Sequence, residues 1–460
     1  MKLKESRRKF LKHTGLLATA GTVLASGMTP YVHAAEHNTI KIALVGCGNR
    51  GNGAARQALA ADPNTKLWAV ADVFPDKSKG AVKLLKEDCE NQNKGHIVDV
   101  SPDRTFDGFD AYKKAMDTLS SGDVVVLTTP PAFRPLHYAY AVEKGLHVFA
   151  EKPVAVDIPG LKFLRESNAK AIAKSLKVGV GLNNRHYFRT EETIKAIQDG
   201  KLGELYSFMV YRSHPAHSLG QAENRTPLQR QLRKIFNYNW VTGGFIVDAL
   251  IHNLDICCWA NQKLPVAALG MGGRLFRRDQ DDLIDNANVQ YVFDDGKIMH
   301  MYTVTMNNTW NGFRAIINGS KGCAVVGEGV DDPQFYETWS GQFIDINNLE
   351  GKKSFWIANS PKNHSYQTEH DRFFKAIRNN QPWNEMDRGI DATFTPILGR
   401  MATETGQFVT AEQAWASTFQ YAPNIDQLTL DGDSPVMPNE HGDYPIPIPG
   451  LATINEPYKT

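Results

Sequence analysis

The sequence predicts an α/β fold in two domains, and two patterns along the chain support this. A short apolar strand, Ile40–Val45, runs into a G-x-G-x-x-G turn and a helix-compatible run, as in a parallel-sheet domain. Later strands follow one another without intervening helices, which is typical of an antiparallel sheet with one exposed face. A chain of 460 residues also exceeds one ordinary core. We therefore expect a parallel-sheet domain followed by an α+β domain with a large, mostly antiparallel open sheet.

The glycine-rich turn has the context of a dinucleotide site, because it joins a strand to a helix. Gly46 would make the tight turn, Gly48 would let backbone approach a pyrophosphate, and Gly51 would let helix pack on strand. N–H groups of the new helix would then hold the diphosphate. A second strand over 66–71 ends on Asp72, an acid placed to accept from a ribose 2′-hydroxyl. The alternative is a tight turn in an ordinary α/β domain.

The other elements of a Rossmann domain follow in order. We expect helices at 78–90, 111–119 and 135–144, with Asp110 as the N-cap of the second and Gly145 ending the third. A Val-rich strand after Asp123, stopped by prolines, suits a parallel sheet covered on both faces. The strand 147–150 delivers Glu151 and Lys152 at its carboxyl end, where open α/β sheets bind ligands. Residues 177–182 would be the last strand, and the domain would span 36–183.

The second domain is expected over 184–420. Its helices would lie at 190–199, 366–378 and 393–405, and its strands at 204–212, 266–272, 287–293, 298–306 and 313–318. Residues 294–296, Asp-Asp-Gly, indicate a hairpin turn. Residues 421–460 are rich in Pro, Asp and Gly, and we expect an extended arm on the surface or on a neighbouring subunit, or else a disordered tail.

The first 35 residues read as a targeting segment. Arg7 and Arg8 stand in a basic stretch that resembles a twin-arginine export signal, and small residues precede a plausible cleavage site. The apolar run 15–28 is short for a membrane span, so we expect none that is stable. A basic disordered tail is the alternative. We predict a periplasmic or otherwise exported protein.

Composition excludes several classes of partner. The 51 basic and 50 acidic residues leave a formal charge of +1, so there is no electrostatic footprint for nucleic acid or an anionic membrane. Five cysteines without C-x-x-C spacing indicate neither a disulfide framework nor a zinc ribbon. We expect no metal.

A polar stripe crosses the apolar stretch 243–259, which reads as a buried helix. Asp248, His252 and Asp255 fall at i, i+4 and i+7 and so share one face. Because burying these groups is costly, they should be paired or functional. One interpretation is an acid–base His oriented by Asp. The others are a structural hydrogen bond and a metal site, for which no third ligand has suggestive spacing. Lys152, if it is not a solvated rim charge, would lie beside a nicotinamide.

These motifs together resemble the glucose–fructose oxidoreductase / inositol dehydrogenase / MocA (Gfo/Idh/MocA) family over about residues 38–405. The resemblance rests on the glycine-rich turn, on Thr129-Pro130, on Glu151-Lys152-Pro153 and on Asp248-x-x-x-His252. It implies a catalytic constellation in which His252 takes a hydroxyl proton, Lys152 holds or relays it, and Asp248 fixes substrate and His. It also implies a homo-oligomer, a dimer or tetramer, because the open sheet often serves as the family's subunit interface.

The resemblance further implies which residues line the cofactor and the substrate. The cofactor residues are Gly46, Gly48, Asn49, Arg50, Gly51, Asp72, Thr129, Pro130, His137, Glu151 and Lys152. Weaker substrate candidates are Arg185, Tyr187 and Asp255. NAD is the expected cofactor because Asp72 repels a 2′-phosphate, with NADP as the alternative given Lys77 and Lys79 nearby.

Export adds a constraint on the chemistry. Because free dinucleotide is not expected outside the cytoplasm, the cofactor would be held tightly and regenerated in place. One fitting reaction is hydride transfer to and from a sugar or polyol hydroxyl carbon. The alternative is an NAD-dependent glycoside hydrolase that acts by oxidation, elimination and reduction. A non-catalytic nucleotide- or sugar-binding protein is the third interpretation.

Overall fold

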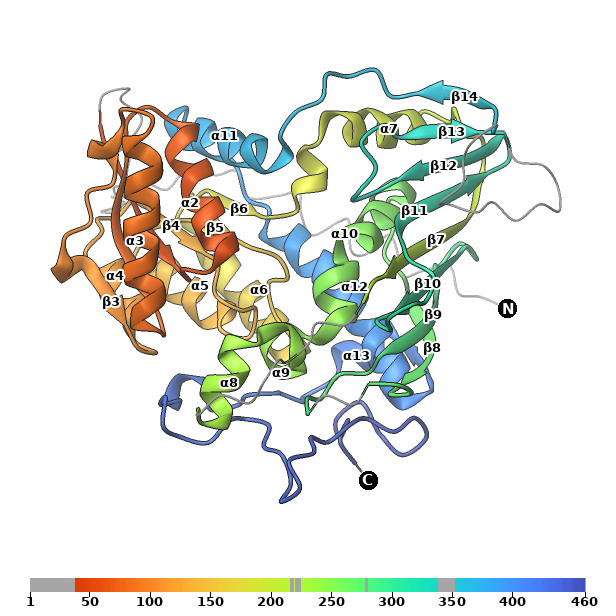
Figure 1. Cartoon of the computed structure of the whole chain (residues 1–460). Coiled ribbons are helices and arrows are strands. Elements are labelled where there is room, and N and C mark those ends of the chain that lie inside the picture. The colour runs from red at the N-terminus through yellow and green to blue at the C-terminus, as the bar shows by residue number, and fades with distance from the viewer. Residues whose placement is uncertain (1–37, 216–218, 220–224, 278–279, 338–351, 460) are drawn as a thin grey trace, which may run out of the picture. The chain divides into compact units, whose positions relative to one another are not determined.

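Two sheets organise the computed structural model, which describes residues 38–459 apart from 216–218, 220–224, 278–279 and 338–351 (Figure 1). The 1–35 segment predicted to direct export therefore lies outside the described residues. The described residues all fall in one compact unit.

The first sheet is parallel throughout and covered on both faces. Its six described strands run in the order β3-β2-β1-β4-β5-β6. Along β1, Ala43 and Val45 enter one core, whereas Ile42 and Leu44 enter a second core on the opposite face. This alternation explains the continuous apolar runs in the sequence. The strands are β1 (Ile40–Val45), β2 (Thr65–Asp72), β3 (Thr105–Asp107), β4 (Val124–Leu127), β5 (His147–Ala150) and β6 (Val178–Val180).

The helices of this domain begin and end close to the expected positions, with two corrections. Asp110 precedes α4, but its side chain forms no capping hydrogen bond. The sequence analysis missed α6, which Asp157 caps by accepting from the N–H of Gly160. Gly145 adopts φ +72° after α5, as a helix-ending glycine does. The helices are α2 (Asn49–Ala61), α3 (Pro75–Glu90), α4 (Ala111–Asp117), α5 (Arg134–Glu143) and α6 (Ile158–Ala173).

The second sheet has nine described strands in the order β14-β13-β12-β11-β7-β10-β9-β8-β15. The sheet is mostly antiparallel, as predicted, but β10 pairs with β7 in parallel. Nothing in the sequence indicated this parallel pair, because the two strands are far apart along the chain. Four short strands were missed: β12 (Gly322–Val326), β13 (Gln334–Tyr336), β14 (Ser354–Ile357) and β15 (Phe408–Thr410). The others are β7 (Leu205–Ser213), β8 (Ala267–Gly273), β9 (Asn286–Val292), β10 (Ile298–Val304) and β11 (Gly312–Gly319).

Helices of the second half cover one face of this sheet and also reach the first sheet. α10 and α12 pack against each other, α10 also contacts β7, and α12 contacts β8, whereas α11 packs against α2 of the first domain. α10 is apolar and long enough to cross a membrane by length and composition, but 83% of its most apolar stretch is buried inside the protein. The described helices are α7 (Phe188–Gln198), α8 (Pro227–Arg233), α9 (Asn239–Thr242), α10 (Gly244–Asn261), α11 (Ser365–Arg378), α12 (Met386–Thr405) and α13 (Ala411–Trp415).

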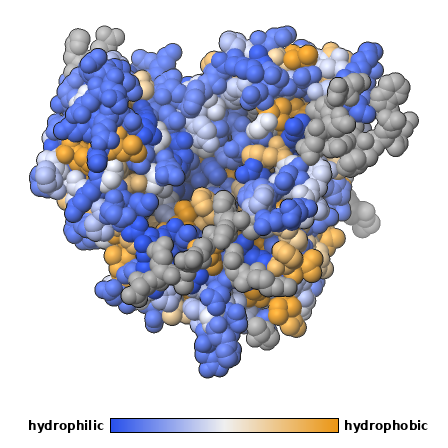
Figure 2. All heavy atoms as spheres, in the orientation of Figure 1, coloured by the Kyte–Doolittle hydropathy of each residue, from blue (hydrophilic) through white to orange (hydrophobic). Residues whose placement is uncertain are grey.

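The other face of the large sheet leaves apolar side chains in solvent. Leu269 and Met271 on β8, Tyr302 on β10 and Phe408 on β15 are all exposed. Phe408 lies opposite Leu269 in the strand register, and Met271 and Tyr302 both lie opposite Asn288 of β9. The four residues therefore belong to one face, and space-filling Figure 2 shows apolar atoms gathered toward this side. Exposed apolar faces of this kind mark interaction surfaces.

The C-terminal arm lies on the chain's own surface. Tyr421, Val436 and Tyr444 are buried in a core cluster with Phe74 of the first domain and Trp240 of the second. Figure 1 shows the arm, in dark blue, running past α8 and α9. The arm therefore joins the two halves of the molecule from outside.

Candidate active site

A cleft of about 540 Å³ opens at the carboxyl end of the parallel sheet. This volume is in the range of small-molecule sites. Most of the residues expected to hold a cofactor line it: Gly46, Gly48, Asn49, Arg50, Gly51, Asp72, Thr129, Pro130 and His137. Glu151 and Lys152 follow the neighbouring strand β5 and lie beyond these lining residues.

The glycines make a cradle that side chains would fill. Gly46 adopts φ +98°, and a Cβ on it would stand 2.5 Å from the amide nitrogen of Thr129. A Cβ on Gly51 would stand 2.0 Å from the carbonyl oxygen of Gly46. A Cβ on Gly48 would meet no described atom within 4 Å, so the backbone there faces open space. This arrangement fits a pyrophosphate lying against the turn and the start of α2.

Asp72 is anchored to the backbone on both sides of its carboxylate. Its Oδ2 accepts from the N–H of Cys47 at 2.7 Å, and its Oδ1 accepts from the N–H of Phe74 at 3.0 Å. Burial raises the pKa of Asp72, and the two N–H groups act against that rise. Each oxygen keeps a second lone pair. Asp72 therefore fits a role as acceptor for a ribose hydroxyl.

The two loops after β4 and β5 are tied together by a buried guanidinium. Arg134, only 1% exposed, donates to the carbonyl oxygens of Thr129 and Pro153. Burial lowers its pKa to about 10, while Glu151 and Asp248 act in the opposite direction. Arg134 therefore links the cofactor cleft to Lys152, and the sequence analysis missed it because an Arg at the start of a helix is usually solvated.

Arg50 points toward Glu151. Its Nε lies 2.9 Å from Oε1 of Glu151, and its guanidinium carbon lies 4.6 Å from the centre of the Tyr366 ring. The Arg50 charge is thus already paired with a buried carboxylate, while its side chain still lines the cleft. The pyrophosphate would depend on the N–H groups of the turn more than on this guanidinium.

Lys152 and Asp248 meet, as the resemblance implied. Nζ of Lys152 donates to the backbone carbonyl of Asp248 at 2.8 Å and lies 3.6 Å from its Oδ1. About a fifth of each side chain is exposed. The ammonium group is therefore fixed at the start of α10 while remaining in contact with solvent.

His252 has a different neighbour from the one expected. Within the described chain it forms no hydrogen bond with Asp248; its Nε2 faces Oε2 of Glu328 at 3.6 Å. The ring is 4% exposed, and its Nδ1 has no hydrogen-bond partner among the described residues. Burial, together with the charges of Lys152 and Arg212, lowers the pKa of His252 well below its usual range. A neutral imidazole at neutral pH is a proton acceptor.

Glu328 and Arg212 complete the cluster, and the sequence analysis missed both. Glu328 follows β12, and its N–H donates to the side-chain oxygen of Asn253, next to His252, at 3.0 Å. Burial raises its pKa, while Lys152 and Arg212 lower it. The glycines before and after Glu328 both have positive φ. This Gly-Glu-Gly pattern was the sequence signal that could have marked Glu328 as a residue held in a special backbone position.

The three weaker substrate candidates each bond to other parts of the protein. Arg185 and Asp255 form a two-point ion pair at 2.7 and 2.8 Å, with 13% and 6% of their side chains exposed. The hydroxyl of Tyr187 donates to the carbonyl of Asp331 at 2.8 Å, in the loop that follows Glu328. The polar stripe of α10 thus divides: Asp248 and His252 face the charged cluster, whereas Asp255 pairs with Arg185.

Comparison with known proteins agrees with the fold and with the cleft at the glycine-rich turn. Residues 40–181 match the oxidoreductase family with an NAD-binding Rossmann fold, and residues 191–325 match the GFO/IDH/MocA C-terminal domain. The chain belongs to the Gfo/Idh/MocA family, as its motifs predicted.

Individual relatives are distant. The inositol 2-dehydrogenase of Burkholderia multivorans is 25% identical over 226 residues, 48% of this chain and 54% of that protein. A glycosyl hydrolase family 109 protein of Streptomyces coelicolor is 28% identical over 172 residues, 37% of this chain and 33% of that protein. The chain thus spans about half or less of these relatives. The aldose–aldose oxidoreductase of Caulobacter crescentus, solved with glycerol, shares the fold: TM-score 0.59, 18% identity, 81% of this chain and 100% of that one.

We predict that Asp255→Asn destabilises the protein without weakening NAD binding. Removing one partner of a buried ion pair leaves the Arg185 charge uncompensated, which costs about 3–5 kcal/mol. Urea unfolding would measure the loss, and fluorescence titration with NADH would measure binding. If the Asp255→Asn variant is as stable as the wild type but has an altered substrate preference, Asp255 would instead be assigned to the substrate site.

The buried ring of His137 makes stability depend on pH. Its Nδ1 lies 3.1 Å from Oγ1 of Thr129, and burial, with Arg134, lowers its pKa to about 3. As the pH drops below about 6.5, His137 takes up a proton in the unfolded chain before it does so in the folded protein. It therefore lowers the free energy of unfolding as the solution becomes more acidic. Between pH 7.5 and 5 the wild type should lose about 2 kcal/mol more than His137→Gln, by urea unfolding at both values. Equal losses would contradict the neutral buried ring.

Proposed function

We propose that the protein is an NAD-dependent oxidoreductase acting on a hydroxyl carbon of a sugar or polyol. The observation that carries this proposal is the buried His252, whose pKa is held well below its usual range by burial and by the charges of Lys152 and Arg212. Arg134 joins that cluster to the loop that lines the cleft. The inositol dehydrogenase relative supports a polyol or sugar as the substrate class.

Bound NAD would supply a hydride acceptor, and the chain would handle the proton. His252 would take the proton of the substrate hydroxyl through Nε2, the ring nitrogen that faces Glu328. The ammonium group of Lys152 would stabilise the developing alkoxide, because a fixed charge in a partly dry site acts strongly. Asp248 would hold Lys152 through its carbonyl and carboxylate.

A second candidate is a redox-neutral glycoside hydrolase that oxidises, eliminates and reduces again. Elimination needs a second proton-transfer group, and Glu328 lies 3.6 Å from His252 with a raised pKa. The similarity to a glycosyl hydrolase family 109 protein also favours this route. The two reactions differ in products: only the second releases a free sugar or alcohol without net oxidation.

We also propose that the protein acts as a homo-oligomer through the exposed face of its large sheet. Leu269, Met271, Tyr302 and Phe408 supply a contiguous apolar surface there. Apolar side chains on a sheet face are the usual core of a subunit interface.

The first test is to purify the protein, denature it and identify any released nucleotide by absorbance and mass. We expect NAD or NADH at close to one per chain. Lys152→Met and His252→Ala should retain the nucleotide but lose about 10²–10⁴-fold in turnover with a sugar or polyol that the wild type converts.

Four outcomes decide between the candidates and test the site. Net oxidation of the sugar supports the first candidate, and release of a free sugar or alcohol without it supports the second. If Lys152→Met and His252→Ala keep full turnover, the assignment of these residues to the active site is wrong. If the wild type binds nucleotide and sugar but converts no sugar, the protein would be a non-catalytic binding protein.

We further propose that residues 1–35 direct export by the twin-arginine route. The paired Arg7 and Arg8 and the weakly apolar run behind them support this. Changing both arginines to lysine should keep the full-length protein in the cytoplasm, by fractionation and immunoblotting. An unchanged distribution would argue against the route, and the wild type in the cytoplasm would argue against export.

A further inference from the structure

The NAD cleft has a wall that the Rossmann domain does not supply. Residues 232–237, from the end of α8 and the turn that follows it, line the same cavity as Gly46, Asp72 and Phe74. Figure 1 shows α8, in yellow-green, below the parallel sheet and away from the large sheet of its own domain. A segment distant in sequence thus lies across from the glycine-rich turn.

One residue of this segment is fastened to the Rossmann domain. Arg233 forms a two-point ion pair with Asp76 at the start of α3, with Nη1 donating to Oδ2 at 2.8 Å. Its guanidinium carbon also lies 4.0 Å from the centre of the Phe74 ring. Arg233 lowers the pKa of Asp76. Both contacts lie within four residues of Asp72, and so at the adenosine end of the cleft.

The C-terminal arm supports the same segment from behind. Gln231, fully buried, donates through Nε2 to the carbonyl of Val436 at 2.9 Å and to the hydroxyl of Tyr444 at 3.0 Å. Thr226, which caps α8, donates to the carbonyl of Leu430 at 3.1 Å. The position of α8 therefore depends on the arm.

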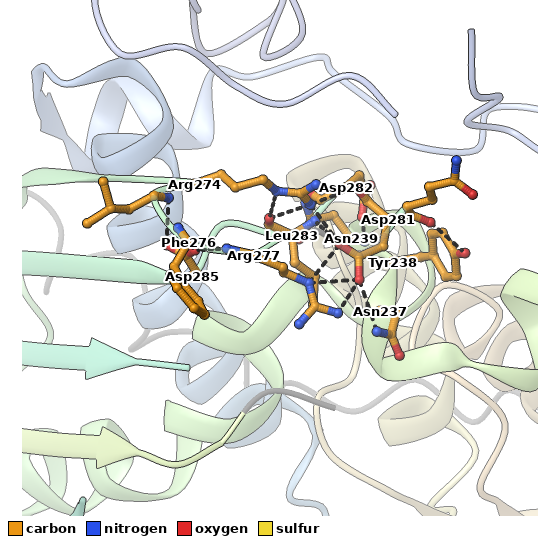
Figure 3. A network of polar contacts seen from close by, with 12 residues as sticks. Asn237, Tyr238, Asn239, Arg274, Phe276, Arg277, Asp281, Asp282, Leu283 and Asp285 are labelled. Carbon is orange, nitrogen blue, oxygen red and sulfur yellow. Dashed lines mark hydrogen bonds and ion pairs between the residues drawn. The ribbon is translucent and has the colours of Figure 1, made fainter. Parts of the chain in front are cut away.

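A buried polar network holds the other end of the segment (Figure 3). Asn237 donates to Oδ2 of Asp281 at 3.0 Å, and the N–H of Asn239 donates to Oδ1 of Asp282 at 2.8 Å. Asp281 is paired with Arg277, and Asp282 accepts from the hydroxyl of Tyr458, near the chain end, at 3.1 Å. Figure 3 shows Asn237, Asn239, Arg277, Asp281 and Asp282 converging between the β8–β9 loop and the start of α9.

We propose that residues 232–237 are a cofactor clamp that closes the adenosine half of the cleft and keeps NAD bound through many turnovers. The clamp is firmly tied to its own domain and to the arm by buried bonds. Leu232 shares a buried apolar cluster with Phe74 of the Rossmann domain. The exposed part of this contact, near the adenosine end, includes the Arg233–Asp76 pair, with 22% and 58% of the two side chains exposed. NAD would leave when this contact opens. The inference rests on the proposed function, because it concerns how that enzyme retains its cofactor.

The test measures release of NADH from the full-length protein. The NADH complex is mixed with excess NAD, and the loss of NADH fluorescence gives the dissociation rate constant. Arg233→Ala should release NADH about tenfold faster, because an ion pair and a cation–π contact are lost. Asp76→Ala should release it about threefold faster, because only the ion pair is lost. The charge-reversed pair Asp76→Arg with Arg233→Asp should restore slow release.

Arg56→Ala is the matched control. Arg56 also pairs with an Asp on α3, Asp88, with Nε 2.6 Å from Oδ2, but neither is among the cleft-lining residues of the described chain. This variant should release NADH as the wild type does. Circular dichroism would confirm that each variant is folded.

The outcomes are distinct. Release by Arg233→Ala within twofold of the wild type would overturn the clamp, as would equal acceleration by Arg56→Ala. Either result would leave the oxidoreductase assignment intact, because NADH still binds. A wild type that binds no NADH would instead overturn the proposed function itself.

Discussion

The buried guanidinium of Arg134 is the interaction on which the candidate site depends most. It donates to the carbonyl oxygens of Thr129 and Pro153, and so fixes the loops after β4 and β5 against each other. One of these loops lines the cofactor cleft, and the other carries Lys152. Because an unpaired buried cation is costly, the Arg134 donors constrain both loops to positions where the carbonyls can reach them. Cofactor and acid–base groups are thereby set relative to each other.

The charges around His252 favour a neutral ring, as the proposed proton transfer requires. Lys152 and Arg212 disfavour the protonated ring, and burial acts in the same direction. Asp248 and Glu328 offset the two cations, so the cluster is not strongly charged as a whole. A buried imidazole of this kind takes a proton only when a nearby carboxylate or alkoxide stabilises the positively charged ring that forms. Glu328 lies where it can do this.

Patterns that depend on near neighbours in sequence were predictable, and long-range contacts were not. The glycine cradle and Asp72 at the end of β2 each follow from a few consecutive residues, and the structure has them. The short strand β3 and the order of the strands in the sheet were not predicted. The i, i+4 spacing of Asp248 and His252 predicted a shared face but could not say that His252 faces Glu328, 76 residues away, which only the path of β12 decides. Asp255 shows the same limit, because its partner Arg185 comes from another element.

The arm and the clamp extend this reasoning to the whole molecule. Proline-rich segments without regular secondary structure have little ordering energy of their own, so they are fixed by what they contact. Here Tyr421, Val436 and Tyr444 are buried against both domains, and Gln231 bonds to the arm while adjoining the cleft wall. Opening the clamp widely would expose this core, whereas a small opening would first break exposed contacts such as the Arg233–Asp76 pair. In the proposed clamp, the arm would limit how far the cofactor cleft opens and so would favour a bound cofactor over an exchanging one.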